Sequence, residues 1–264
     1  MATVIVANDL VGVGKVALTS SLPIMSACQT EVLPLPTVLL SSHTGEFENI
    51  YMRDLTDDLK GFYKQWEHLD FTVDGLVSGY FKSREELKIV GQLARDKRIA
   101  LFVDPIMGDN GRLYQGFDME YVEAMKDFCQ QADAIIPNLT EASLLTDSPY
   151  LEVGSYDKAT VDKLLRDLTK LGPRKVVLTG ISFEEGKIGL AYFDKETNKT
   201  TYLMRKSYKS HFYGSGDLVT AILASGYFHH LNLLKVANLA LDFMDQVLSS
   251  TLASGRPFKI WSLL

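Results

Sequence analysis

A glycine-rich segment at residues 213–217 is the strongest chemical feature of this sequence. Gly214, Ser215, Gly216 and Asp217 precede the run Leu-Val-Thr-Ala-Ile-Leu-Ala-Ser-Gly, which continues on a helical period. Glycines at a helix start let backbone N–H groups converge, and the helix dipole adds positive potential that suits a phosphoryl group. Asp217 would lie in the first turn, where it could accept the proton of an attacking hydroxyl. A glycine loop with a capping aspartate is the structural alternative.

Two more carboxylates follow the predicted strand that ends at Asp104. Pro105 cannot continue a ladder, so the Asp104 carboxylate should be left at the carboxyl edge of the sheet. Asp109 follows in a loop rich in Gly and Asn. Hard oxygen ligands of this kind suit Mg²⁺. Turn chemistry alone explains Asp109-Asn110-Gly111 equally well, and both interpretations stay open here.

A third motif, Ile136-Pro137-Asn138-Leu139-Thr140-Glu141, also follows a predicted strand and opens a helix. Asn138 and Glu141 are three residues apart, so their side chains can share one face and meet a ligand. The same spacing is typical of a capping box, in which Glu141 serves only the helix start.

The segment 34–45 is typical of a strand that runs into a loop. The loop offers the His43 imidazole and the hydroxyl of Thr44 as contacts for a ligand. A surface or structural role for His43 is the alternative.

The glycines at 12 and 14 require a test against known phosphate motifs. A Walker A loop needs a glycine where Asp9 stands and a hydroxyl where Val16 stands, so that motif is excluded. A dinucleotide fingerprint tolerates Ala17 at its third glycine position. NAD(H) binding therefore remains a weak alternative.

Periodicity predicts the elements that must position these residues. Short β-branched runs alternate with amphipathic segments, which indicates repeated β-α units and a mostly parallel sheet covered by helices on both faces. The expected strands are 3–7, 73–78, 99–104, 134–136 and 175–179, with an antiparallel hairpin at 188–193 and 200–206. The expected helices are 15–28, 55–69, 83–97, 118–131, 140–146, 157–171, 215–229 and 233–252. Residues 30–50 are the least regular. Ligands of such sheets bind beyond the carboxyl ends of the strands.

Composition limits the class of protein. The 264 residues carry a formal charge of -6, which argues against nucleic acid or an anionic membrane as the main partner. The amino terminus lacks the basic start of a signal peptide, and no run approaches the roughly 18 apolar residues of a membrane span. Cys28 and Cys129 lack metal-site spacing and are expected to be reduced, helix-borne thiols of a cytoplasmic protein. The whole chain, 1–264, is interpreted as one domain.

Taken in order, these segments resemble the pyridoxal/pyridoxamine kinase family of the ribokinase-like superfamily. The resemblance covers most of the chain, from Asn8 to about Ala224. Its motifs are L-P-T-V-L-L-S-S-H-T-G, S-G-Y, V-D-P-I-M-G-D-N-G-R-L-Y, I-P-N-L-T-E and G-S-G-D. The resemblance implies a three-layer α/β/α fold and a homodimer that phosphorylates the 5′-hydroxymethyl group of a B6 vitamer. It also implies MgATP and a monovalent cation such as K⁺.

The resemblance further implies roles for individual residues. Asp217 would be the catalytic base, and the amides of Gly214, Ser215 and Gly216 would form the anion hole. Asp9, His43, Thr44, Tyr80 and Asp217 would contact the pyridine substrate. ATP and its metal would meet Asp104, Asp109, Asn138, Glu141 and Thr179, with Asp104 and Glu141 nearest the metal, and Tyr202, Leu203, Met204 and Arg205 would lie along the nucleotide.

Some residues depart from the family pattern. The amino-terminal loop of the family commonly offers a serine to the substrate, and here Asn8 or Asp9 is expected to make that polar contact. The loop 109–116 is the expected lid, which would exclude water from ATP. One alternative is a kinase of thiamine synthesis that acts on hydroxymethylpyrimidine or on its phosphate. The other is a non-catalytic protein that binds B6 vitamers.

Overall fold

The computed structural model describes residues 1–254 except 46, 70 and 211. One nine-stranded sheet, ordered β11-β10-β9-β8-β5-β4-β1-β2-β3, runs through the molecule. Its strands are β1 (Ala2–Val13), β2 (Thr30–Ser42), β3 (Met52–Asp54), β4 (Gly75–Ser78), β5 (Ala100–Val103), β8 (Ala134–Ile135), β9 (Lys175–Ile181), β10 (Lys187–Asp194) and β11 (Lys199–Lys206). The pairs from β2 to β9 are parallel, and β3, β10 and β11 join antiparallel.

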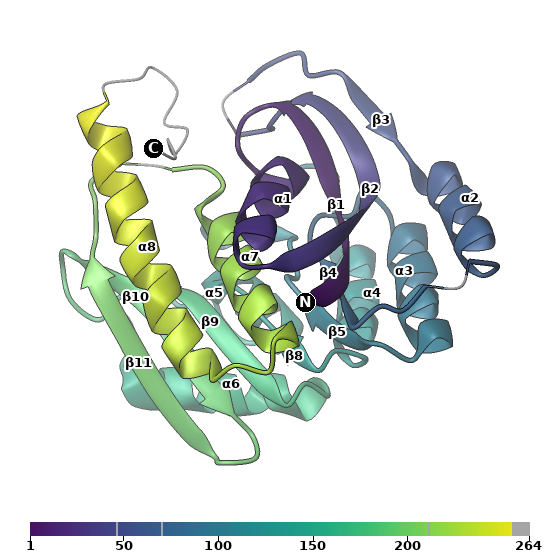
Figure 1. Ribbon diagram of the computed structural model, residues 1–264. Coiled ribbons are helices and arrows are strands. Elements are labelled where there is room, and N and C mark those ends of the chain that lie inside the picture. The colour runs from purple at the N-terminus through teal and green to yellow at the C-terminus, as the bar shows by residue number, and fades with distance from the viewer. Residues whose placement is uncertain (46, 70, 211, 255–264) are drawn as a thin grey trace.

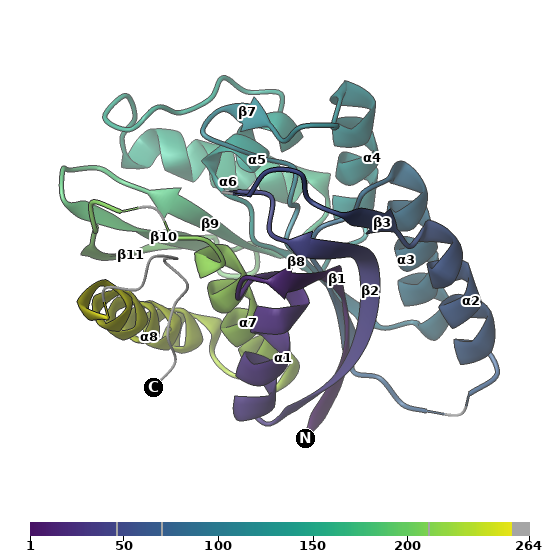
Figure 2. The ribbon, with the colours of Figure 1, turned by 90° about the horizontal axis from the view of Figure 1, so that it is seen from above.

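Helices cover both faces of this sheet, as Figures 1 and 2 show. One face packs α2 (Thr56–Trp66), α3 (Arg84–Lys97), α4 (Met119–Cys129), α5 (Leu139–Leu145) and α6 (Lys158–Leu171), and the other packs α1 (Ala17–Ala27), α7 (Ser215–Phe228) and α8 (Leu233–Ala253). Because neighbouring residues of a strand point to opposite faces, Leu76 joins the first core and Val77 the second. The predicted three-layer α/β/α architecture is confirmed, and each predicted helix begins and ends within three residues of its predicted bounds.

The strands differ more from the prediction than the helices do. The predicted strand 3–7 extends to Val13, and the irregular span after residue 30 contains the long strand β2 and the short β3. The expected lid also contains strand structure, because β6 (Gly108–Asp109) and β7 (Arg112–Leu113) pair in a small separate hairpin. Elements of two or three residues carry too little periodicity to be recognised in a sequence.

The glycines of the first loop have packing roles. Gly12 lies inside β1, and a Cβ there would come within 2.8 Å of the carbonyl oxygen of Ser41 on β2. Gly14, with φ +125°, lies in the turn before α1 and against the ring of His43. A dinucleotide fingerprint requires its glycines in the turn between strand and helix. The position of Gly12 within the strand therefore contradicts the dinucleotide alternative.

A row of backbone hydrogen bonds aligns the carboxyl ends of the strands. The amide of Gly79 donates to Ala7, that of Asp104 to Ser78, that of Ile136 to Val103 and that of Thr179 to Pro137, at 2.8–3.0 Å. The motifs that contain Tyr80, Asp104 and Asn138 thus each continue from a strand end that is hydrogen-bonded to its neighbour. The fold places the motifs at one edge of the sheet, which we call the catalytic edge.

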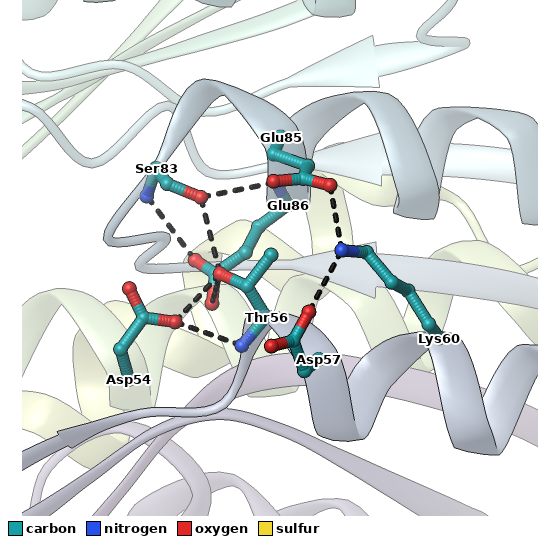
Figure 3. Close-up of polar contacts among 7 residues, drawn as sticks. All are labelled: Asp54, Thr56, Asp57, Lys60, Ser83, Glu85 and Glu86. Atoms are coloured by element: carbon teal, nitrogen blue, oxygen red, sulfur yellow. Dashed lines mark hydrogen bonds and ion pairs between the residues drawn. The ribbon is translucent and has the colours of Figure 1, made fainter.

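A polar network joins α2 to α3 beside this edge (Figure 3). Ser83 caps α3 in a capping box with Glu86, whose Oε2 accepts from the amides of Lys82 at 2.6 Å and Ser83 at 3.3 Å. The hydroxyl of Thr56 lies 2.6 Å from Asp54 Oδ1 and 3.3 Å from Glu86 Oε1. This network fixes residues 80–83, which lead from β4 into α3.

The remaining expectations concern the cysteines and membranes. Cys129 is buried in α4, Cys28 is half-buried at the end of α1, and both thiols are free. Within the described ranges, none of the helices has the length and apolar character to cross a bilayer.

Candidate active site

The start of helix α7 forms the centre of the catalytic edge. Gly214 caps the helix in the left-handed region (φ +79°), where a Cβ would lie 2.3 Å from the carbonyl oxygen of Lys15. Only glycine fits this conformation and this contact. The amides of Ser215, Gly216 and Asp217 are the first of the helix and have no acceptor within it. Gly216 is exposed and nothing lies within 4 Å of a Cβ built there, so this turn of the helix borders open space.

Asp217 lies in the first turn of α7, close to donors from β1 and α1. The Asn8 side chain and the Ala17 amide lie near this carboxylate and lower its pKa. Burial nevertheless raises the pKa of Asp217, since desolvation outweighs these donors. The residue therefore combines a fixed orientation with increased basicity, which is what a general base requires.

Asp104 lies next to this helix, at the end of β5. Thr220, one turn after Asp217, donates its hydroxyl to Asp104 Oδ2 at 2.7 Å. Burial and, to a smaller extent, the charge of Asp217 raise the pKa of Asp104 to about 7, against the lowering effect of the Thr220 hydroxyl. The hydrogen bond attaches α7 to β5 and brings two of the predicted carboxylates together.

Glu141 completes this group from the start of α5. Its Oε2 accepts from the Asn138 amide at 2.8 Å and its Oε1 from the Met107 amide at 3.3 Å, while Asn138 Oδ1 accepts from the Glu141 amide. The predicted capping box is therefore present. Glu141 is also 3% exposed, and burial followed by the charge of Asp104 raises its pKa well above the usual value. The capping and ligand-site interpretations are compatible.

Asp104 and Glu141 offer two carboxylates to a metal ion. In the described part of the chain, no three His, Cys, Asp or Glu side chains are grouped to hold a metal ion. Magnesium, however, is usually held by one or two carboxylates together with substrate phosphates and water. Asp104 and Glu141, whose negative charges oppose one another, fit that incomplete donor set.

Asn138, Asp109 and Thr179 are connected to Glu141, either directly or through Asn138. Asn138 Nδ2 donates to the carbonyl of Gly108 at 2.9 Å, and the backbone of Asn138 forms an isolated parallel bridge with that of Thr179 in β9. Asp109 accepts from the amide and side chain of Asn110, which is the predicted turn chemistry, yet its charge also raises the pKa of Glu141. The hairpin β6–β7 thus holds Asp109 near Glu141.

His43 forms an aromatic cluster with Tyr213 and Phe47 beside the start of α7. The ring is buried, lies 4.5 Å from the ring of Tyr213 and 5.0 Å from that of Phe47, and its Nδ1 accepts from the Gly45 amide at 3.2 Å. Tyr213 also donates its hydroxyl to the Gly45 carbonyl at 2.9 Å. Because Tyr213 immediately precedes Gly214, the aromatic cluster is attached directly to the glycine loop. Thr44, in contrast, is exposed in the turn.

Tyr80 and Asp9 form a second group of the site, next to Asn8. The Tyr80 amide donates to Asn8 Oδ1 at 2.8 Å, and the Thr37 hydroxyl donates to the Tyr80 carbonyl at 2.7 Å. Asp9 is 8% exposed, and burial together with the charge of Asp217 raises its pKa to about 8. The pKa of Tyr80 rises to about 12 through burial and the charge of Asp9, which places the two side chains in one environment.

Residues 202–205 lie apart from this group, on the edge strand β11. The Tyr202 hydroxyl donates to Asp162 Oδ1 of α6 at 2.6 Å, while Arg205 pairs with Asp242 of α8 at 2.7 Å. Leu203 and Met204 pack on opposite faces of the sheet. These four side chains are held by helices, three strands away from β8 in the sheet.

Two residues of the site, Thr220 and Tyr114, have no individual role predicted from the sequence, and for Asn8 only a substrate contact is predicted. Thr220 bonds Asp104 and Asn8 bonds the Tyr80 amide, while the pKa of Tyr114 is raised by burial and then by the charges of Glu141, Asp109, Asp104 and Asp217. Thr220 follows Asp217 by three residues, a spacing that places both on one helix face and could have identified it. Asn8 and Tyr114 act through long-range contacts, for which a single sequence carries no signal.

Comparison with known proteins gives relatives of this chain in sequence and in fold. The sequence model of the phosphomethylpyrimidine kinase family matches residues 56–260. Pyridoxal kinase from Lactobacillus plantarum is 32% identical, with a TM-score of 0.91 over 99% of this chain and 93% of that one. A candidate phosphomethylpyrimidine kinase from Bacteroides thetaiotaomicron, crystallised with pyridoxal, is 31% identical, with a TM-score of 0.91 over 98% and 90% of the two chains. Pyridoxal kinase from Dictyostelium discoideum is 26% identical over 84% of this chain and 77% of its own length.

Proposed function

This chain belongs to the phosphomethylpyrimidine kinase family, and from that premise we propose that it transfers the γ-phosphate of ATP to the 5′-hydroxymethyl group of a B6 vitamer. The observation that carries the proposal is the position of Asp217. Its carboxylate lies at the amide-rich start of α7, and its charge raises the pKa of both Asp104 and Asp9. Such a site can accept a proton from a hydroxyl and stabilise a phosphoryl group at the same place.

The pyridine ring is proposed to bind in the pocket between His43 and Tyr80. Two aromatic walls with few polar groups suit a flat heteroaromatic ring. Asp9, whose carboxyl is protonated at neutral pH according to its raised pKa, is placed to donate to a ring substituent. Thr44 lies in the turn at the rim of this pocket.

The phosphates of ATP are proposed to meet the amides of Gly214, Ser215 and Gly216. Asp104 and Glu141 would hold Mg²⁺ together with those phosphates, and the ion would neutralise charge that develops on the transferred group. Asp109, Asn138 and Thr179 surround this position. A contact from residues 202–205 would be made by the β11 backbone, since the side chains of Tyr202 and Arg205 are held by α6 and α8.

In the proposed reaction, the substrate hydroxyl lies in line with the γ-phosphate and within hydrogen-bond distance of Asp217. Asp217 takes the hydroxyl proton as the bond between the substrate oxygen and the γ-phosphorus forms. The bond between the γ-phosphorus and the oxygen that bridges it to the β-phosphate breaks, and ADP leaves with that oxygen. The hairpin β6–β7 and Tyr114 are proposed to cover the site, so that water does not replace the substrate hydroxyl. We also propose a single domain over residues 1–264, a homodimer, a cytoplasmic location and a monovalent cation such as K⁺ near the phosphates.

The proposal is tested by ADP release from the purified protein with MgATP and a panel of acceptors. Pyridoxal, pyridoxamine and pyridoxine should be turned over, and sugars should not. Turnover of hydroxymethylpyrimidine alone would assign the protein to the pyrimidine branch that gives the family its name. Tight binding of vitamers without turnover of any acceptor would indicate a non-catalytic binder.

A second measurement tests the substrate pocket. His43→Ala removes a ring that packs on Tyr213 and lies beside the proposed pyridine site. KM for the vitamer should rise about tenfold, in the range expected for one lost aromatic contact, while KM for ATP is unchanged. A change in the KM for ATP alone would place the pyridine elsewhere.

A further inference from the structure

Asn8 lies between the two halves of the site and uses both ends of its side chain. The residue stands at a bulge in β1, where the register with β2 shifts between Asn8 and Leu10, and it is 5% exposed. Its Oδ1 accepts from the Tyr80 amide at 2.8 Å and from the Asp9 amide at 3.0 Å. A side-chain oxygen that accepts two backbone amides identifies the other end as the donor, because Asn carries one carbonyl and one NH₂ group.

The NH₂ end faces the proposed base. The Asn8 side chain lies close enough to the Asp217 carboxylate to lower its pKa, and the Ala17 amide has the same effect. One side chain therefore connects the Tyr80 wall of the pocket to the carboxylate that would accept the substrate proton. Neither contact depends on a ligand.

The glycine of the S-G-Y motif preserves this arrangement. A Cβ at Gly79 would lie 2.4 Å from the Cγ, Oδ1 and Nδ2 atoms of Asn8, far inside van der Waals contact. The backbone of Gly79 does not have a positive φ, so its conformation does not require glycine. The close approach of Asn8 explains why glycine is needed there.

We propose that Asn8 is a positioning residue that orients the Asp217 carboxylate toward the substrate hydroxyl and fixes it relative to the Tyr80 wall. The inference rests on the proposed kinase function, because it assigns Asn8 a part in the same reaction. It differs from the expected substrate contact at this position, since both ends of the side chain are used by the protein. Asn8 acts on the rate through Asp217 and does not touch the reacting atoms.

The decisive variant is Asn8→Asp, which keeps an oxygen for the Tyr80 and Asp9 amides and removes the NH₂ donor. At pH 8, kcat should fall about 10- to 100-fold, the range for losing a hydrogen bond to a charged group, while KM for the vitamer and for ATP stays within about twofold. Asn8→Leu, which removes both contacts, should in addition raise the vitamer KM. If Asn8→Asp retains wild-type kcat, Asn8 serves only the loop and the inference is wrong.

A second test does not depend on how Asn8→Asp folds. Gly79→Ala pushes a methyl group against the Asn8 side chain and should lower kcat by a similar factor. In the Asn8→Gly background the same methyl group meets no side chain, so Gly79→Ala should cause little further loss. Additive effects of the two substitutions would overturn the inference. Wild-type turnover is measured first: its absence contradicts the proposed function, whereas normal turnover in all these variants contradicts only the role of Asn8.

Discussion

Helices α3 and α5 both begin with a capping box in which a glutamate three residues after the cap is buried. In α3 the pair is Ser83 and Glu86, and in α5 it is Asn138 and Glu141. Both glutamates accept two backbone amides, and burial raises the pKa of both. By local geometry the two helix starts are nearly the same.

Their surroundings differ. Glu86 faces the hydroxyl of Thr56 (Figure 3). Burial is the main cause of its raised pKa, its two backbone hydrogen bonds lower that pKa, and the charge that raises it is that of Asp54. Glu141 faces Asp104 and Asp109, and Asp104 in turn lies beside Asp217. A capping box therefore does not reveal whether its glutamate also serves a ligand. That follows from which other charges the fold brings to the same place.

The largest expected effect concerns the carboxylate that has no counterpart near α3. Asp217→Ala should lower kcat at least about 100-fold, because the base that accepts the substrate proton is lost. ATP affinity should be retained, since the amides of Gly214 to Gly216 remain. Steady-state kinetics and nucleotide titration measure the two effects. Near-normal turnover would remove Asp217 from the role of base.

Replacing each of the two glutamates with glutamine, one at a time, tests the comparison between the two helix starts. Glu141→Gln should lower kcat/KM for MgATP about tenfold or more, because it removes a charge beside Asp104 and sets an NH₂ group against the Asn138 or Met107 amide. Glu86→Gln, the matched control, should stay within about twofold of wild type. Equal losses in both variants would mean that Glu141 acts only as a helix cap.

The sequence predicts the frame of this site better than its contacts. Helix bounds were predictable because 3.6-residue periodicity and capping residues are local signals, as in α6, where Val161, Leu164, Leu165 and Leu168 form a buried stripe. Asp217, Asp104 and Glu141 were predictable because each follows a strand or opens a helix. The row of hydrogen bonds between strand ends aligns the segments of Asp104 and Glu141, and the Thr220 hydroxyl joins α7, which carries Asp217, to Asp104.

The remaining parts depend on contacts between distant residues. Asn8 and Tyr80 are 72 residues apart, and Thr220 and Asp104 are 116 apart. Neither pair has a local pattern that would join its members. The strands β3, β6 and β7 are too short to show an alternation, and they form where neighbouring segments offer a partner. Residues 202–205 show the same limit, because the sequence does not reveal that α6 and α8 hold their side chains.

A pH titration of stability sharpens the description of Glu86. Thr56 has one hydroxyl proton and lies closer to Asp54 than to Glu86, so Glu86 Oε1 lacks a good donor when ionised. The pKa of fully buried Glu86 is about 7, against 4.5 for a free glutamate. The folded state therefore binds this proton more tightly than the unfolded state, and stability from this group falls as pH rises from about 4.5 to 7 and is level above.

Glu86→Gln carries no such proton, so comparison with wild type isolates the effect. Relative to wild type, the unfolding free energy of Glu86→Gln should rise between pH 4.5 and 7.5 by on the order of 3 kcal/mol. Urea unfolding at a series of pH values measures the difference, and other titrating groups cancel from it. A constant difference would show that the Glu86 pKa is normal in the folded protein.

The smallest expected effect concerns Thr56, the hydroxyl that joins α2 to the α3 cap. Thr56→Ala removes the bond to Asp54 Oδ1 and the contact with Glu86, which should destabilise the protein by about 1 kcal/mol. Thr160 is the matched control, because its hydroxyl bonds Asp157 at 2.8 Å at the start of α6 with no second helix involved. Thr160→Ala should cost less, and Thr56→Ser should restore wild-type stability. If the two alanine variants unfold at the same urea concentration, the link between α2 and α3 contributes nothing beyond an ordinary helix start.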